Sequence, residues 1–248
     1  MAEKSCYGTL RGTIIAVAVG ATCVAHAVTF NVLDFGAKGD GKTKDTAAIQ
    51  KAVDAASKAG GGEVLLPKGV YLSGSVFLKS GVDFHLADGA VLKGSPDPAD
   101  YNALDIAPQN WGRLGSGDNI SGGHLVLCVE QENVTLRGPG KIDGNVGAFL
   151  KMPDGSHPPT KLKIPWRPAQ MVWFVESRNI AIRDIEIADA PYWSCFFPFA
   201  QVRRIAFLHR PNAAPSSSTP SLSCGRFRRY CAIRGNMVKF RRIKQRLN

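Results

Sequence analysis

A nine-residue segment that recurs 46 positions later constrains the fold of this 248-residue chain more than any other feature. Residues 129–137, VEQENVTLR, match residues 175–183, VESRNIAIR, position by position. A looser earlier copy carries Gly81 where the later copies carry Asn133 and Asn179. Gly and Asn are the residues that most readily take a positive φ. Each copy is therefore predicted to turn sharply at that residue before a short strand.

The strand after the second Asn turn alternates apolar and polar residues. In NIAIRDIEIAD, four isoleucines are predicted to face an interior, with a change of register at Asp184. A repeated strand–turn–strand unit cannot bury its apolar face alone and must stack on its neighbours. We therefore predict an all-β solenoid of the parallel β-helix type. A β-sandwich is the alternative, but it explains the strands and not the repeated turn.

One amphipathic helix precedes these repeats. Asp45 is a candidate N-cap for TAAIQKAVDAASKA, in which Ile49, Val53 and Ala56 share one face, and Gly60 follows as a stop. Short strands broken by Gly, Asp and Pro come next. They are GEVLLP, VYLSGSVFL, VDFHL and AVLKGS.

The formal charge of +11 is unevenly distributed. Residues 198–248 hold ten Arg, two Lys and no acidic residue, a charge of +12, whereas residues 1–197 hold 19 basic and 20 acidic residues. The main body is thus close to neutral. We predict a monomer without a nucleic-acid or membrane partner and without a cofactor.

The N-terminus, residues 1–27, has the features of a secretory signal peptide. Lys4 and Arg11 precede the apolar run TIIAVAVGATCVA, which is followed by the small-x-small site Ala25-His26-Ala27. This run is shorter than the roughly 20 apolar residues that span a bilayer. We predict a secreted, extracellular protein. A buried strand or helix at the start of the domain is the alternative.

The cysteines leave their pairing open. Cleavage after Ala27 would leave Cys128, Cys195, Cys224 and Cys231, and an oxidising compartment permits disulfides. Cys128 and Cys195 lie in strand-like apolar runs, where a cysteine also serves as a small buried hydrophobic residue. No Cys/His cluster has metal-ligand spacing, so no metal site is predicted.

Several motifs occur in an order known from one enzyme family. The segment FNVLDFGAKGDGKTKDTAAIQKAVDAA is followed by GGGEVLLPKGVYLSGSVFLKSGVDFHLADGAVLKGS, NVTLRGPGKIDGN, Arg167-Pro168 and NIAIRDIEIADAPYW. On these motifs, residues 29–197 resemble the polygalacturonases of glycoside hydrolase family 28. The resemblance implies a right-handed parallel β-helix with the predicted helix capping its N-terminal end. It also implies hydrolysis of α-1,4-galacturonan, the pectic polysaccharide, in a groove along one sheet.

The catalytic motifs of that family are missing. An inverting glycosidase needs two carboxyl groups about 6.5–9.5 Å apart. The family takes them from Asn-Thr-Asp and Asp-Asp motifs, assisted by Gly-His-Gly and Arg-Ile-Lys, all after the strand that contains Pro191-Tyr192-Trp193 here. The first three motifs are absent, and Arg242-Ile243-Lys244 lies in a tail where a chance match is expected. We therefore predict no catalytic residue and no hydrolysis by this chain.

A few other residues are candidates for binding. Trp166 and Trp193 are both candidates to stack on sugar rings, and core packing is the alternative for each. Trp193 lies in the strand that the resemblance places near the groove and is the predicted substrate contact. Asp184, Glu186 and Asp189 are closely spaced carboxylates that would bind a cation or sugar, but outward-facing strand positions explain them better.

Two N-x-[ST] sequons predict glycosylation at Asn119 and Asn133 if the chain enters a glycosylating route. Asn133 is also the turn residue of the repeat, so its modification requires an exposed side chain.

The tail, residues 198–248, marks a change of character. It is rich in Arg, lacks acids and shows no Asn turn, which is typical of a shifted reading frame, a translated intron or a disordered basic tail. The predicted β-helix is therefore truncated after Phe197. The alternative function is non-catalytic binding of acidic polysaccharide through the fold and the basic tail. A related lyase would need Ca²⁺-binding carboxylates that the sequence does not identify.

Overall fold

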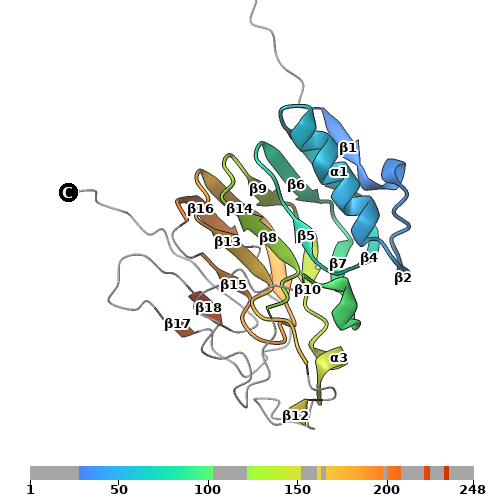
Figure 1. Ribbon diagram of the computed structural model, residues 1–248, viewed down its shortest axis with the longest axis vertical. Helices are drawn as coiled ribbons and strands as arrows, with labels where there is room; N and C mark the ends of the chain where they lie inside the picture. Colours follow the sequence, from blue (N-terminus) through green and yellow to red (C-terminus); the bar gives the residue numbers. More distant parts are fainter. Residues whose placement is uncertain are drawn as a thin grey trace, which may run out of the picture.

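The computed structural model describes residues 28–102, 122–151, 161–162, 166–197, 200–207, 221–223 and 232–234. The predicted signal segment, residues 1–27, lies outside them. The described part consists mostly of parallel β-strands with few helices (Figure 1). Within that part, no helix has the length and apolar character needed to cross a membrane.

The chain passes through three sheets in a fixed order and then returns to the first. Sheet A contains β1 (Thr29–Asn31), β3 (Gly62–Leu66), β6 (Val82–Leu86), β9 (Thr135–Arg137), β14 (Ile180–Ala188) and β16 (Val202–Phe207). Sheet B contains β2 (Asp40–Lys44), β4 (Gly69–Ser73), β7 (Ala90–Gly94), β10 (Lys141–Asp143) and the second half of β14. Sheet C contains β5 (Val76–Phe77), β8 (Val126–Val129), β13 (Val172–Val175), β15 (Cys195–Phe196), β18 (Ala232–Arg234) and β17 (Ser221–Ser223).

The remaining elements are short or lie beside the sheets. They are η1 (Val32–Phe35), α1 (Thr46–Lys58), η2 (Pro98–Asp100), α3 (Val146–Phe149) and the antiparallel pair β11 (Leu150–Lys151) and β12 (Lys161–Leu162).

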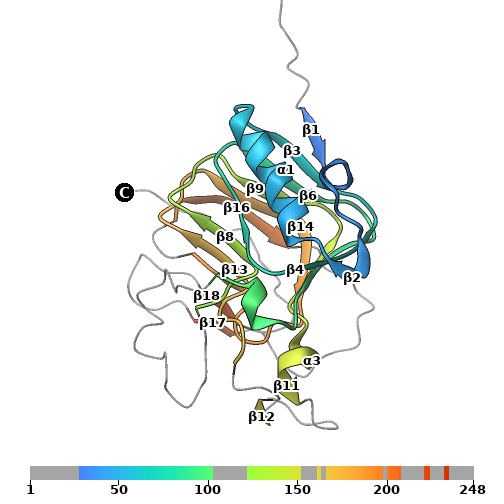
Figure 2. The same cartoon turned by 45° about the vertical axis from the view of Figure 1, so that its right-hand side comes forward.

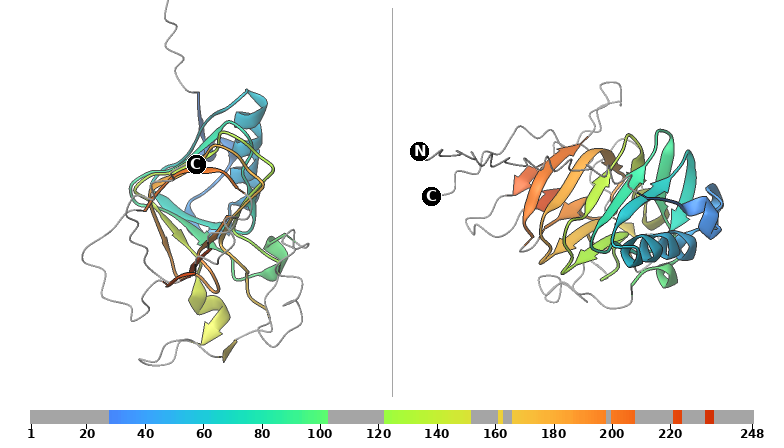
Figure 3. Two further views of the ribbon diagram at one scale, coloured as in Figure 1. Left: turned by 90° about the vertical axis from the view of Figure 1, so that its left-hand side faces the viewer. Right: turned by 90° about the horizontal axis from the view of Figure 1, so that it is seen from above.

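Each passage through the sheets, here called a rung, stacks on the one before it (Figure 3). The repeat of 46 residues is the register of this stacking: β9 pairs with β14 as Thr135 with Ala181, and β8 pairs with β13 as Val126 with Val172. Almost all pairings between β1 and β16 are parallel and join different rungs, the exception being β11 with β12. A β-sandwich, whose sheets are antiparallel, is therefore excluded.

The predicted turn residues have the expected backbone conformation. Gly81, Asn133 and Asn179 have φ of 78°, 59° and 53°. The two asparagines also stack across rungs, because Asn179 Nδ2 donates a hydrogen bond of 2.5 Å to Asn133 Oδ1. The turn is thus fixed both by its own dihedral angles and by a side-chain ladder.

The change of register predicted at Asp184 is confirmed. Asp184 has a φ of 56°, and β14 bends there from sheet A into sheet B. Ile180, Ile182 and Ile185 are fully buried, whereas Ile187 is only partly buried against the core. The bend allows alternating isoleucines to face the same interior on both sides of the corner.

Helix α1 packs on the first rungs, against β1, β3, β5 and β6 (Figure 2). Its buried face contains Ile49, Val53 and Ala56, as predicted, and Gly60 follows the helix with a φ of 87°. Asp45 occupies the N-cap position, but its side chain does not cap the helix. Its carboxylate accepts hydrogen bonds from the backbone N–H groups of Lys38 and Gly39, at 2.7 and 3.0 Å, and so fixes the preceding loop.

Parallel pairing continues past Phe197, where the sequence pattern predicted its end. Strand β16 pairs with β14, beginning with Val202 beside Ile180. Ile180 N donates to the carbonyl of Gln201, so Gln201 takes the place that Asn179 has in the rung before. The register then shifts by one residue, which leaves Arg203 unpaired, before Arg204 aligns with Ala181. Strands β17 and β18 add to sheet C in antiparallel orientation.

Candidate functional site

Trp193 lies where the chain enters β15 of sheet C. Its carbonyl accepts a hydrogen bond of 2.9 Å from Met171 N, so the pairing of β13 with β15 begins here. The indole ring stacks on Tyr192, with centroids 5.6 Å apart and an interplanar angle of 16°, and meets Phe196 edge-on at 5.8 Å. Phe196 in turn contacts the buried ring of Trp173 at 5.1 Å. Trp193 is therefore the partly buried outer member of an aromatic cluster on sheet C.

Arg167 covers the other part of this cluster. Its guanidinium carbon lies 4.9 Å from the centroid of the Tyr192 ring, within the range of a cation–π contact. One of its terminal nitrogens donates to the carbonyl of Pro191 at 3.1 Å, which fixes the guanidinium relative to the backbone. The sequence identified Arg167 only as part of a motif. Its contact with Tyr192 joins residues 25 positions apart and has no signature in sequence spacing.

Trp166 has a different role from Trp193. Its ring lies 5.1 Å from Tyr101 and 5.6 Å from Phe149, and it packs against the main core. Of the two interpretations that the sequence left open for Trp166, core packing is the one that the structure supports.

The three carboxylates on β14 and after it do not converge. Asp184 is exposed at the bend, and Asp189 forms an ion pair of 3.0 Å with Lys141. Lys141 also contacts Asp143 at 2.8 Å. Burial lowers the pKa of Lys141, but the hydrogen bonds that its ammonium donates to Asp143 and Asp189 outweigh this effect and leave the pKa raised. No three His, Cys, Asp or Glu side chains gather in a metal-binding arrangement within the described ranges.

A charged ladder crosses the outer face of sheet A and was not identified from the sequence. Glu63 on β3 accepts hydrogen bonds from His85 Nδ1 at 2.7 Å and from an Arg137 terminal nitrogen at 2.6 Å. Arg137 Nε also contacts both oxygens of Asp83 at 2.8 Å. Burial raises the pKa of Glu63. Hydrogen bonds from His85 and Thr29 and the charge of Arg137 lower it by more, so the net shift of the pKa is downward. The alternation of each strand is visible in the sequence, but the rung-to-rung register that aligns these groups is not.

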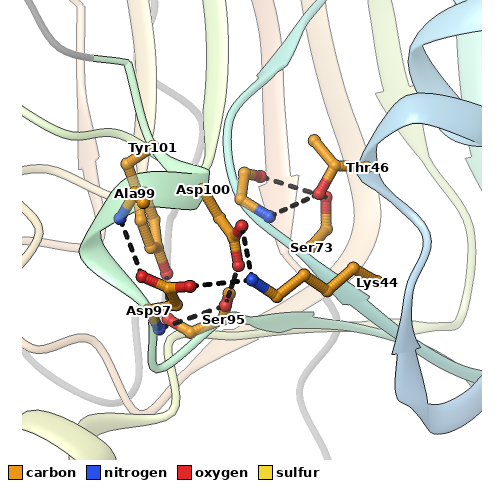
Figure 4. A network of polar contacts seen from close by, with 9 residues as sticks. Lys44, Thr46, Ser73, Ser95, Asp97, Ala99, Asp100 and Tyr101 are labelled. Carbon is orange, nitrogen blue, oxygen red and sulfur yellow. Dashed lines mark hydrogen bonds and ion pairs between the residues drawn. The ribbon is translucent and has the colours of Figure 1, made fainter.

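A second polar network fastens the end of β2 to η2 (Figure 4). Lys44 Nζ lies 2.8 Å from Asp97 and 2.9 Å from Asp100. The Ser95 hydroxyl donates to the Asp100 carboxylate, and the Tyr101 hydroxyl donates to the Ser95 carbonyl at 2.9 Å. Lys44 is half exposed, and such surface pairs contribute little free energy. We assign this network to the positioning of residues 95–102.

The two predicted glycosylation residues differ in what the structure shows. Asn133 is exposed at its turn, and its Oδ1 accepts the hydrogen bond from Asn179. Asn119 lies outside the described residues, as do Cys224, Cys231 and the Arg242-Ile243-Lys244 match. Cys128 and Cys195 are both buried. Burial raises the pKa of the Cys128 thiol to about 12, although a hydrogen bond with Ser177 acts in the opposite direction.

The family comparison now identifies the type of fold. A family model described as rhamnogalacturonase A/epimerase, pectate lyase-like, matches residues 29–137. The chain has a pectate lyase-like fold. Its homologues include polygalacturonases and mannuronan epimerases, each matched over part of its length.

Two relatives illustrate the range of the match. The chain is 33% identical over 135 residues to an exo-poly-α-D-galacturonosidase of Dickeya chrysanthemi, and the matched region covers 51% of this chain and 21% of that protein. It is 36% identical over 136 residues to the mannuronan C5-epimerase AlgE2 of Azotobacter vinelandii, and the matched region covers 51% of this chain and 13% of that protein. The chain therefore spans about a fifth or less of these two relatives.

Solved structures agree on the fold. A hyperthermoactive exopolygalacturonase of Thermotoga maritima matches with a TM-score of 0.54 and 24% identity, over 72% of this chain and 47% of that one. A family 28 exopolygalacturonase of Yersinia enterocolitica matches with a TM-score of 0.55 and 23% identity, over 73% and 39%. At these identities the likeness concerns the pectin lyase-like β-helix architecture alone.

Proposed function

We propose that this chain recognises an acidic polysaccharide, with the galacturonan of pectin as its substrate class. It would do so as part of a right-handed parallel β-helix of the polygalacturonase type, closed at its N-terminal end by α1. The observation that carries the proposal is the cluster of Arg167, Tyr192 and Trp193 at the start of β15. Support comes from the relatives, whose names describe action on galacturonan and on mannuronan, both of them uronate polymers.

The chemistry of the cluster suits a uronate. Tyr and Trp offer flat apolar faces with a polar tip, and a sugar ring offers an apolar face of C–H groups. Arg presents a planar array of N–H donors that matches the geometry of a carboxylate. A galacturonate residue combines the apolar face and the carboxylate, so it fits the combination of Trp193 and Arg167.

We propose further that the 248-residue chain binds without hydrolysing. Its sequence has neither an Asn-Thr-Asp motif nor adjacent aspartates. Inverting hydrolysis needs one carboxyl group as general acid and a second as general base on opposite faces of the bond. Asp143 and Asp189 are both engaged by Lys141. Incubation with polygalacturonate should release no reducing ends above a heat-inactivated control, and measurable release would contradict this part of the proposal.

The binding site is tested by affinity electrophoresis of the full chain in gels that contain polygalacturonate or neutral dextran. Retardation is expected with polygalacturonate only. Trp193→Ala should weaken it about fivefold or more, because truncation of a central aromatic contact typically costs over 1 kcal/mol. Leu33→Ala is the matched control, since it shortens an exposed apolar side chain on η1. Equal retardation of both variants would reject the cluster as the site.

Mannuronan is the second candidate ligand, favoured by the 36% identity to a mannuronan C5-epimerase. Alginate gels of matched charge provide the comparison. Stronger retardation in alginate than in polygalacturonate would replace galacturonan by mannuronan as the substrate class. Retardation in neither would reject recognition of acidic polysaccharide.

Secretion is also part of the proposal, on the pattern of residues 1–27. In a eukaryotic secreting host, intact-mass analysis should find the chain in the medium, beginning at Val28. Peptide mapping should find glycan on Asn133, whose side chain is exposed, and at Asn119. A protein retained in the cell with residues 1–27 intact would contradict the proposed signal peptide.

A further inference from the structure

Arginines accumulate on the outer face of sheet A toward the last described rungs. Arg137 on β9 aligns with Arg183 on β14, and Arg204 on β16 aligns with Ala181, two residues before Arg183. The unpaired residue of β16, Arg203, lies next to Arg204 and is exposed. We call Arg137, Arg183, Arg203 and Arg204 the arginine strip. Figures 1 and 2 show its strands, β9, β14 and β16, side by side.

Only one member of the arginine strip has acidic partners in the described part of the chain. Arg137 contacts Glu63 and Asp83, at 2.6 and 2.8 Å. Within the described ranges, Arg183, Arg203 and Arg204 form no hydrogen bond or ion pair through their side chains. Acidic groups thus occupy the first rungs of this face and uncompensated arginines the last.

The last described rungs concentrate positive charge on this face of sheet A. Neighbouring strands lie about 4.8 Å apart, and like charges directly opposite each other on adjacent strands are destabilising. Arg183 lies opposite Arg137, whose charge is balanced by Glu63 and Asp83. The repulsion therefore falls mainly among Arg183, Arg203 and Arg204 on the neighbouring strands β14 and β16, which have no ion-pair partner within the described residues. A ligand with several carboxylates would relieve this repulsion and form charge-assisted hydrogen bonds at the same time.

We propose that the arginine strip is a second binding surface for an acidic polysaccharide, separate from the aromatic cluster on sheet C. A chain of uronates presents one carboxylate per sugar, and the strip presents about one arginine per rung. The residues that align with these arginines along the strands are Thr135 and the buried Ala181, neither of which offers the aromatic platform that single-stranded nucleic acids use. The identity of the polymer rests on the proposed function, whereas the position of the surface does not.

The test compares two double variants of the full 248-residue protein. Arg183→Gln with Arg204→Gln removes two charges from the strip. Lys51→Gln with Lys58→Gln removes two charges from exposed positions of α1 and is the matched control. The strip variant should bind polygalacturonate about tenfold more weakly than the control in titration calorimetry, because it loses the charge-assisted hydrogen bonds of two exposed, solvent-screened arginines. The rest of the basic tail, residues 208–248, is identical in both proteins, so its contribution cancels.

Two further measurements keep the outcomes distinct. Arg203→Gln alone alters an exposed, unpaired strand position, so it should fold normally and still weaken binding severalfold. Trp193→Ala reports on the sheet C cluster independently.

Equal affinities of the strip and control variants would overturn the inference even if Trp193→Ala weakens binding. A strip effect without a Trp193 effect would instead reject the proposed site and keep the strip. Equal or tighter binding of single-stranded DNA of matched charge, lost in the strip variant, would overturn the assignment to polysaccharide.

Discussion

Gly138 is a residue at which the close stacking of rungs leaves no space for a side chain. It follows β9 with a φ of 114°, and a Cβ atom there would overlap the carbonyl oxygen of Leu86 in the rung before. Gly147, in α3, has no atom within 4 Å of the corresponding position. Gly138→Ala should therefore lower the free energy of unfolding by about 2 kcal/mol or more, whereas Gly147→Ala should change it little. Urea unfolding of the two variants measures this, and equal midpoints would contradict it.

Cys128 should be chemically silent in the folded protein. Burial raises the pKa of its thiol to about 12 from an ordinary value of 9.0, so the reactive thiolate is suppressed. Because the folded pKa is raised above the unfolded one, the stability that this group contributes is complete below pH 9 and is lost as the pH rises toward 12. Iodoacetamide at pH 8.5, followed by peptide mass spectrometry, should label Cys128 only after denaturation. Rapid labelling of the native protein would contradict the buried position.

The turn residues show what the sequence could predict at this scale. Asn133 and Asn179 were identified because Asn readily takes a positive φ and because they repeat. Glu130 and Glu176 also have positive φ, at 53° and 48°, and occupy equivalent positions in the two copies. Glutamate has no preference for this conformation, so only the structure reveals it.

At the scale of single elements, Asp45 links α1 to the loop before it. Its two carboxylate oxygens each accept one backbone N–H, and the residue is 1% exposed. Asp45→Asn would direct an amide N–H₂ group at one of those donors and leave it unsatisfied. We expect a loss of about 1–3 kcal/mol in the free energy of unfolding. Asp34→Asn, at an exposed position of η1, is the control, and denaturant midpoints compare the two. A midpoint for Asp45→Asn equal to that of the control would show that these hydrogen bonds contribute nothing measurable.

The strands themselves were largely predictable. GEVLLP, VDFHL and AVLKGS became β3, β6 and β7, and VYLSGSVFL divides into β4 and β5 at its central Gly74. Strand β16 was missed for two identifiable reasons. Gln201 replaces the turn asparagine, and the additional Arg203 breaks the alternation that marked the earlier copies. The Asn-turn pattern therefore ends one rung before the parallel pairing does.

At the scale of the whole molecule, the two proposed surfaces should differ in their response to salt. The arginine strip acts through exposed charges, which are screened within about 8 Å at physiological ionic strength. In the sheet C cluster, Trp193 carries no charge and contributes stacking contact, while the charged partner there is Arg167. Removing Arg183 and Arg204 should flatten the salt dependence of binding to polygalacturonate, whereas Trp193→Ala should lower affinity at every salt concentration without changing the slope. Affinity measured from 50 to 500 mM NaCl distinguishes the two, and parallel lines for all variants would contradict the division.

The candidate site was less predictable than the fold. Trp193 was identified through a resemblance, but its stacking on Tyr192 and the position of Arg167 depend on how the loop before β13 meets the loop before β15. The arginine strip depends on the register between rungs, which a one-residue shift at Arg203 alters. Contacts across rungs follow from the three-dimensional stacking and leave no periodic signal in the chain.

The central claim is that this chain recognises the acid group of a uronate polymer. It is tested most directly by titration calorimetry of the 248-residue protein with oligogalacturonate and with the same oligomer fully methyl-esterified, which keeps the sugar and removes the charge. We predict that the free acid binds at least about tenfold more tightly, since charge-assisted hydrogen bonds to arginine are lost in the ester. Equal affinities, or tighter binding of the ester, would contradict the account.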